Sequence, residues 1–249
     1  HPQVFMPPGK EINYFFDPKK FERGRAWYAA QFADAPEGSM CGEASPGYIC
    51  HRRSPMRIQR AFPDAKLIVT LRDPISRAYS QYWDNRRWLR ESRHFDTLVR
   101  EPLHQIFVPE KRNYFSRGLY SIYLERFLAV FPREQLLILW FSELRNSPDT
   151  FFQKCFEFLE IDPSFRCDEM TQAANYRSFF DNPLYRFFFH RPALAARLPP
   201  GARFLLRWGQ NTPFSPDPIS DETRARLEGY YAPFNRRLAR IVGHGLPWE

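Results

Sequence analysis

The sequence has little cysteine and no long apolar run. Its four cysteines are too few for a disulfide framework in 249 residues, and none forms a C-x-x-C pair of the kind found in zinc or redox sites. No stretch reaches the roughly 18 uncharged apolar residues that a membrane span needs, and the mean hydropathy is −0.55. The six histidines lack metal-ligand spacing. We therefore exclude a disulfide-stapled miniprotein and expect neither a membrane span nor a metal site.

Basic charge is what the sequence has in excess. It has 36 lysines and arginines against 28 acidic residues, a net charge of +8 and a pI of about 9.5, and only six of the 36 are lysines. The planar guanidinium of arginine suits phosphate and sulfate oxyanions. The composition therefore predicts an anionic partner, which could be nucleic acid, an anionic lipid surface, a polyanionic glycan or a phosphorylated cofactor.

Short apolar runs alternate with amphipathic stretches over residues 10–144, which indicates an α/β fold. Strands are expected at 12–16, 41–43, 66–71 and 136–141, and the last two are nearly all apolar, like strands of a buried parallel sheet. Helices are expected at 22–32, 56–62, 74–90, 117–131, 149–159 and 221–242. Beyond residue 161 we expect irregular structure up to the last helix. No linker divides the chain, so we expect one domain over residues 1–249.

The most informative segment spans residues 66–82. An apolar strand ends at Arg72, the Asp73-Pro74 pair offers an N-cap and a first-turn proline for a helix, and Ser80 follows two helical turns later. Ligands of open α/β sheets bind beyond the carboxyl ends of the strands, where Arg72 is placed. Arg72 and Ser80 are therefore candidates for a phosphate clamp. The alternative is an arginine paired with a carboxylate and an ordinary helix serine.

Three further segments carry candidate residues. Glu11, beside Lys10 at the start of an expected strand, is suited to act as a general base, although from these residues alone a solvated Lys-Glu pair at a strand edge is the better explanation. Residues 42–48 form a turn-rich loop at another strand end. Residues 116–120 open a helix with a basic side chain, which is either a substrate contact or a plain helix start.

These segments, in this order, resemble the sulfotransferase domain family that uses 3′-phosphoadenosine 5′-phosphosulfate (PAPS), and in particular its heparan-sulfate-like and bacterial branch. The resemblance covers nearly the whole chain, and the piece from Arg72 to Ser80 is the most specific. The matching pieces are Lys10-Glu11 with Phe15-Phe16, Arg23-Gly24 with Trp27-Tyr28, Gly42-Glu43 with Ser45-Pro46, Leu71-Arg-Asp-Pro with Arg77-Ala-Tyr-Ser80, Arg117-Gly118 with Tyr120, Phe131-Pro-Arg-Glu-Gln-Leu, Phe141 to Leu144, and Tyr230-Tyr-Ala-Pro-Phe-Asn-Arg-Arg-Leu.

The resemblance implies a P-loop-NTPase-like three-layer sandwich with a mostly parallel sheet, and an in-line sulfuryl transfer from PAPS to a hydroxyl or amine of a carbohydrate, without a metal. It implies that Arg72 and Ser80 hold the 3′-phosphate of the nucleotide and that Glu11 removes the proton of the acceptor. It also implies that Lys10 counters the charge on the transferred group. The expected acceptor contacts are Asn13, Glu43, Ser45, Arg117 and Tyr120.

The sequence also departs from the family pattern. The glycine- and lysine-containing phosphosulfate loop and the first strand are expected upstream of His1, so we expect an incomplete domain that is inactive on its own. Ala44 stands where heparan enzymes often carry lysine, which argues against heparan sulfate itself as the acceptor. The basic nucleotide-binding loop near the carboxyl end has several candidates, namely Arg177, Arg186, Arg191, Arg203 and Arg207.

Two other functions are left open by the residues alone. A P-loop kinase would share the fold, but the Arg72/Ser80 and Lys10-Glu11 pairs argue against it. A basic nucleic-acid-binding module would use the aromatic residues for stacking, but those around residues 151–158 fall at helical spacing, which is more typical of a core. We therefore expect PAPS and a glycan, not nucleic acid, as partners. Arginine-rich, cysteine-poor usage favours a bacterial cytoplasm over the Golgi lumen.

Overall fold

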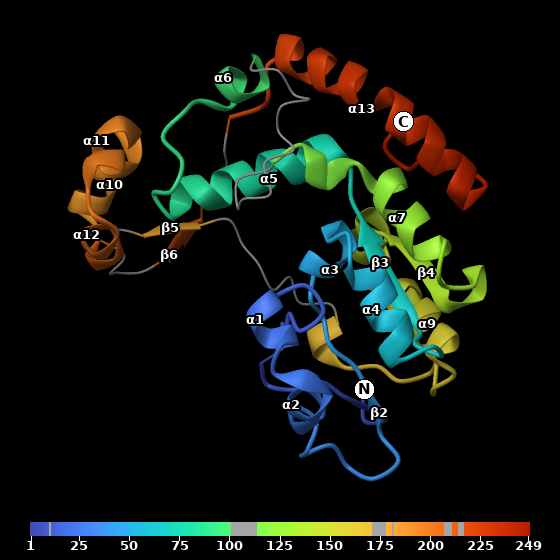
Figure 1. Cartoon of the computed structure of the whole chain (residues 1–249). Helices are drawn as coiled ribbons and strands as arrows, with labels where there is room; N and C mark the ends of the chain where they lie inside the picture. Colours follow the sequence, from blue (N-terminus) through green and yellow to red (C-terminus); the bar gives the residue numbers. More distant parts are fainter. Residues whose placement is uncertain (10, 101–113, 171–177, 181, 207–210, 214–216) are drawn as a thin grey trace. The chain divides into compact units, whose positions relative to one another are not determined.

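The computed structural model describes residues 1–9, 11–100, 114–170, 178–180, 182–206, 211–213 and 217–249 (Figure 1). The chain divides into two compact units. The first contains His1–Leu71 and Ser121–Thr171, and the second contains Arg72–Tyr120 and Gln172–Glu249. Each unit is described separately below.

The first unit is built around parallel strand pairs. Strand β3 pairs with β4 in register from Leu67 opposite Leu136 to Leu71 opposite Trp140, and β1 pairs with β2. Its strands are β1 (Val4–Phe5), β2 (Met40–Cys41), β3 (Leu67–Leu71) and β4 (Leu136–Trp140). Its helices are α1 (Pro18–Phe21), α2 (Gly24–Ala30), α3 (Gly47–Cys50), α4 (Ser54–Ala61), most of α7 (Tyr120–Leu128), α8 (Phe141–Asn146) and α9 (Pro148–Leu159), with short 3-10 turns at Arg133–Gln135 and Asp168–Met170.

Two apolar clusters hold the first unit together. Leu139 of β4 packs with Phe151, Cys155 and Phe156, so α9 covers one face of that strand. The other cluster gathers aromatic rings that follow residue 11 with rings from α2 and α7. Its buried members are Ile12, Tyr14, Phe15, Tyr28, Ile58, Phe127 and Phe131. Burying large apolar rings stabilises the unit by roughly 1.5–3 kcal/mol for each side chain.

The second unit is organised around helix α5 (Pro74–Arg87). Helix α13 (Asp221–Val242), strand β5 (Ser178–Phe180) and the 3-10 turn at Ser116–Gly118 all contact α5. Strand β5 pairs antiparallel with β6 (Asn211–Pro213). The unit also contains α6 (Phe95–Arg100), α10 (Pro183–His190), α11 (Pro192–Arg197) and α12 (Pro200–Leu205).

Gly118 allows the close approach between these elements. A Cβ atom at Gly118 would lie 2.7 Å from Cβ of Pro74 and 2.9 Å from the ring of Tyr231, closer than side-chain packing permits. Tyr231 is itself buried and donates its hydroxyl to the main-chain carbonyl of Phe115. Only a glycine therefore lets the turn pack against the start of α5 and against α13.

The predicted parallel strands at 66–71 and 136–141 are confirmed, and the last helix has the predicted bounds. The strand predicted at 12–16 is wrong. Asn13 has φ 60°, a left-handed conformation that interrupts an extended chain, and residues 14–16 form a turn closed by the bond from the Asp17 N–H to the Asn13 carbonyl. The apolar residues there are buried in the aromatic cluster, not in a sheet.

The structure also corrects the expectation of irregular structure beyond residue 161. The described residues of this region contain β5, β6 and three short helices, α10, α11 and α12. Each of these helices has proline at its first position, where the missing N–H costs no hydrogen bond. The prolines that break the hydrophobic periodicity therefore mark helix starts.

Candidate active site

The corner that precedes α5 is fixed by a carboxylate cap. Asp73 accepts hydrogen bonds from the N–H of Ile75 at 3.2 Å, the N–H of Ser76 at 2.9 Å and the hydroxyl of Ser76 at 2.5 Å. Pro74 occupies the first helical position, as the sequence predicts. Arg72 directly precedes this cap, and Ser80 lies in the same helix; both are half-buried. The predicted clamp residues thus flank a rigid helix start.

A second element holds Arg72 through its main chain. Tyr120, which is 5% exposed, donates its hydroxyl to the main-chain carbonyl of Arg72 at 2.9 Å. Arg117, three residues earlier, has an exposed side chain on the 3-10 turn. Arg72, Ser80, Arg117 and Tyr120 all belong to the second unit.

The segment around Glu11 belongs to the first unit. The side chain of Glu11 is exposed, and no donor to its carboxylate is found among the described residues. Its main-chain carbonyl accepts a hydrogen bond from the side-chain amide of Asn13 at 3.1 Å. The N–H of Asn13 in turn donates to the hydroxyl of Ser45 at 2.9 Å. Lys10 lies outside the described residues.

Glu43 is the centre of a hydroxyl cluster beside this segment. Its carboxylate accepts hydrogen bonds from Ser45 at 2.5 Å, from Tyr48 at 2.7 Å and from Tyr28 at 3.0 Å. The Tyr48 hydroxyl also accepts the N–H of Phe15 at 3.4 Å. The cluster therefore ties the loop around residues 43–48 to the segment at 11–15.

The tyrosines of this cluster are hydrogen-bond donors over the whole physiological pH range. Burial, reinforced by the neighbouring Glu43 carboxylate, raises the pKa of Tyr28 and of Tyr48 well above the ordinary value of a phenol. Sequence reasoning gave neither tyrosine a role. Their only signal was that Tyr28 stands in a piece that resembles the family, and Tyr48 closes the turn-rich loop.

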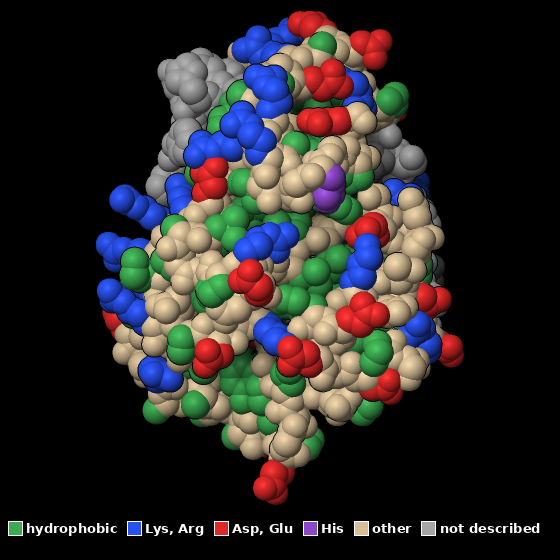
Figure 2. Space-filling view, turned by 90° about the vertical axis from the view of Figure 1, so that its right-hand side faces the viewer, with side chains coloured by type: hydrophobic (Ala, Val, Ile, Leu, Met, Phe, Trp, Pro, Cys, Tyr) green, Lys and Arg blue, Asp and Glu red, His purple; other side chains and the backbone are tan. Residues whose placement is uncertain are grey.

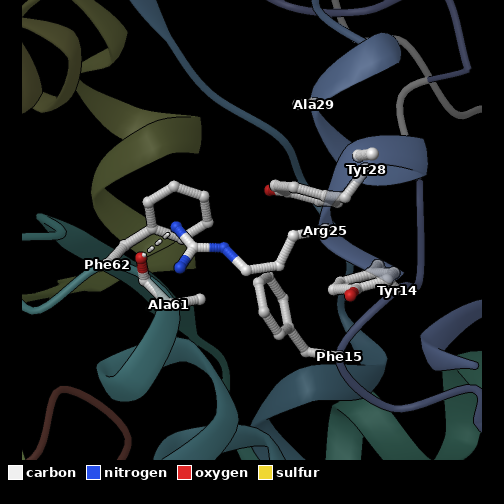
Figure 3. Close-up of a pocket in the computed structure, with 8 residues that line it drawn as sticks. Tyr14, Phe15, Arg25, Tyr28, Ala29, Ala61 and Phe62 are labelled. Carbon is white, nitrogen blue, oxygen red and sulfur yellow. Dashed lines mark hydrogen bonds between the residues drawn. The ribbon is translucent and has the colours of Figure 1, made fainter. Parts of the chain in front are cut away.

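A cavity of about 250 Å³ lies in the first unit, between α2 and the end of α4 (Figure 3). The rings of Tyr14, Phe15 and Phe62 surround it, and Arg25 crosses it to donate a hydrogen bond to the main-chain carbonyl of Ala61 at 3.1 Å. Tyr28 is also in its wall. None of the residues predicted for the site lines this cavity.

In the described part of the chain, no group of three or more histidine, cysteine or acidic side chains is arranged to hold a metal ion. In the same part, no helix combines the length and the apolar character that a bilayer crossing needs.

Residues 53–183 match the model of the sulfotransferase domain family, and this match covers more than half of the chain. The chain belongs to that family. Arg72, Ser80, Arg117 and Tyr120 lie within the matched range, whereas the residues from Glu11 to Ser45 precede it.

Similar proteins support the assignment. Heparan sulfate glucosamine 3-O-sulfotransferase 3A1 of Mus musculus is 26% identical over 236 residues, which are 95% of this chain and 56% of that protein. Bifunctional heparan sulfate N-deacetylase/N-sulfotransferase 4 of Mus musculus is 25% identical over 267 residues, 99% of this chain and 28% of that protein. The chain thus spans about half the length, or less, of these relatives.

A solved structure confirms the fold. A sulfotransferase from Alicyclobacillus acidocaldarius superposes with a TM-score of 0.71 at 23% identity, over 99% of this chain and 88% of that one. The chain therefore has the P-loop-like α/β fold of sulfotransferases, with parallel strands, as the sequence predicts.

Proposed function

We propose that this protein transfers a sulfuryl group from PAPS to a hydroxyl or amine of a carbohydrate. The observation that supports this most directly is the family match over residues 53–183, because it includes the corner where Arg72 and Ser80 flank the capped start of α5. Two relatives are named as sulfotransferases of heparan sulfate, which supports a carbohydrate acceptor. The net charge of +8 suits an acceptor that is already anionic.

In this proposal Arg72 and Ser80 bind the 3′-phosphate of the donor. A guanidinium and a hydroxyl together offer the charge-assisted hydrogen bonds that a phosphate monoester accepts. The Asp73 carboxylate accepts hydrogen bonds from the first turn of α5, and these bonds hold the corner in place. Tyr120 restrains the Arg72 main chain through its hydrogen bond to the carbonyl. The clamp is thus held by groups that do not themselves need to touch the nucleotide.

Glu11 acts as the general base. Its carboxylate is exposed and receives no hydrogen bond from the described residues, so it is open to a proton from the acceptor. As that proton moves to Glu11, the acceptor oxygen or nitrogen attacks sulfur, and the bond between sulfur and the bridging oxygen breaks. The sulfuryl group passes to the acceptor and 3′,5′-ADP leaves. Lys10 would counter the charge on the transferred group, as the family resemblance implies.

Calorimetry with 3′,5′-ADP tests the nucleotide site. Arg72→Ala should weaken binding by roughly 10- to 150-fold, which corresponds to about 1.5–3 kcal/mol for a charge-assisted bond. Arg60→Ala, at an exposed arginine of α4, is the matched control and should bind like the parent. Equal affinity for 5′-ADP and 3′,5′-ADP would favour a kinase-like nucleotide site and would contradict the proposal.

A further inference from the structure

The outer surface of α10, α11 and α12 exposes apolar side chains. In the described part of the chain eight large hydrophobic side chains are exposed, and four of them fall in this stretch of 24 residues, 183–206. They are Leu184 (52%), Phe187 (43%), Leu194 (39%) and Leu205 (73%). Half of the exposed large hydrophobic side chains of the described residues therefore fall within one short segment of the chain.

These side chains are not needed for the core of the unit, because the opposite side of α10 is already packed. Tyr185 is fully buried and donates its hydroxyl to the Arg87 carbonyl of α5 at 2.8 Å. Arg86 of α5 donates to the carbonyl of Phe189 at 3.2 Å. Leu184 and Phe187 are three residues apart on the other side of the helix. Helix α10 is thus apolar on two sides, of which one is covered.

The same surface is cationic without acidic neighbours in the sequence. Residues 182–216 contain no aspartate or glutamate, and 183–206 contain four arginines. Arg186, Arg191 and Arg197 are exposed, and the guanidinium of Arg191 lies 4.3 Å from the ring centroid of Phe187. Arg203 instead donates to main-chain carbonyls. On the face shown in Figure 2, by contrast, basic and acidic side chains are interspersed.

We propose that α10, α11 and α12 dock on the surface of an anionic lipid bilayer. Leucine and phenylalanine side chains that project beside arginines are what an interfacial helix uses: the apolar groups enter the acyl boundary and the guanidiniums bind lipid phosphates. The stacking of Arg191 on Phe187 lets the charged end stay at the headgroups while the ring is buried. Aliphatic side chains such as Leu184 and Leu205 do not stack on bases, which disfavours nucleic acid.

Vesicle co-sedimentation of the 249-residue chain tests this surface. The chain should sediment with vesicles of phosphatidylcholine and phosphatidylglycerol, and not with phosphatidylcholine alone. The pair Arg191→Gln and Arg197→Gln should lower the binding constant by about fivefold for each charge removed, and added salt should weaken the parent more than this variant. The pair Leu184→Ser and Phe187→Ser should lower it by about tenfold or more.

Matched controls test whether vesicle binding depends on this surface or on the overall charge and apolar exposure of the protein. Arg236→Gln with Arg240→Gln removes two exposed charges from α13, and Met6→Ser with Met56→Ser removes two exposed apolar side chains from the first unit; both should bind like the parent. If the serine variant loses its circular dichroism signal, the arginine variant decides the question. Equal binding of the parent to both kinds of vesicle would overturn the proposal, and so would control variants that lose as much binding as the test variants. Binding of the parent to a polyglutamate column but not to vesicles would also overturn it, because this would show attraction to any polyanion.

Discussion

The hydroxyl of Tyr120 lies 2.9 Å from the main-chain carbonyl of Arg72, to which it donates a hydrogen bond. Tyr120 is the first residue of α7, and Arg72 is the residue that follows β3. The hydrogen bond therefore joins the start of α7 to the end of β3, across 48 positions of the sequence. Because the hydroxyl of Tyr120 is committed to this carbonyl, we interpret Tyr120 as a positioning residue for the nucleotide clamp.

Removing this hydrogen bond should weaken nucleotide binding without abolishing it. Tyr120→Phe keeps the buried ring but loses about 0.5–1.5 kcal/mol of hydrogen bonding, so the affinity for 3′,5′-ADP should fall by roughly two- to twelvefold. Tyr185→Phe is the control, since Tyr185 is a buried tyrosine of the same unit whose hydroxyl donates to the main-chain carbonyl of Arg87, at the other end of α5. Calorimetry measures both, and an unchanged Tyr120→Phe affinity would contradict the positioning role.

The Glu43 cluster should contribute to the stability of the first unit. Glu43→Gln replaces a carboxylate that accepts three hydroxyl donors with an amide whose NH₂ end cannot accept them. We expect the free energy of unfolding to fall by about 1.5–3 kcal/mol, as for hydrogen bonds to a charged group. Urea unfolding measures this, with the exposed Glu37→Gln as control. Equal losses in the two variants would show that the cluster contributes nothing specific.

Glu91 should make the second unit sensitive to acid. Burial by itself would raise the pKa of this carboxyl, but hydrogen bonds from Arg93 and Tyr114 and the charge of Arg93 outweigh it and lower the pKa below its ordinary value of 4.5. Since the folded-state pKa is depressed, Glu91 contributes stability above about pH 4.5, and this contribution is lost as the pH falls through the folded pKa.

The measurement compares urea unfolding of the parent and of Glu91→Gln at several pH values. The parent should be the more stable protein near neutral pH, and the difference should shrink below the ordinary carboxyl pKa of 4.5. Glu228→Gln, at an exposed position of α13, should track the parent at every pH. A difference for Glu91→Gln that is constant with pH would rule out ionisation as its cause.

The sequence was sufficient to predict those structural features whose causes act within a few residues. The Asp73-Pro74 pair predicts the start of α5 because the cap and the proline both act within the first turn. The apolar run at 67–71 likewise predicts β3. The candidate clamp residues Arg72 and Ser80 could be selected for the same reason, since they flank these elements.

The other features of the fold and the site depend on contacts between residues that are distant in sequence. The run at 12–16 has the composition of a strand, yet Asn13 turns left-handed and the aromatic residues enter a cluster with Tyr28 and Phe127. The hydroxyl donors to Glu43 come from positions 15 residues before and 2 and 5 residues after it, a set that no local pattern specifies. Tertiary packing overrode the strand propensity of residues 12–16, and it also brought together the hydroxyl donors to Glu43.

Substitution of Glu11 gives the sharpest test of the proposed chemistry. Glu11→Gln keeps the shape of the side chain but cannot take the acceptor proton, so kcat should fall by about 10²–10⁴, the usual contribution of a positioned base. The affinity for 3′,5′-ADP should stay the same, because Glu11 acts on the acceptor. Glu22→Gln, an exposed glutamate of the same unit, should keep its kcat. Turnover of labelled PAPS separates these outcomes: an exposed glutamate without a catalytic role contributes little even to stability, so a near-parental kcat for Glu11→Gln would remove Glu11 from the mechanism while leaving the nucleotide site at Arg72 intact.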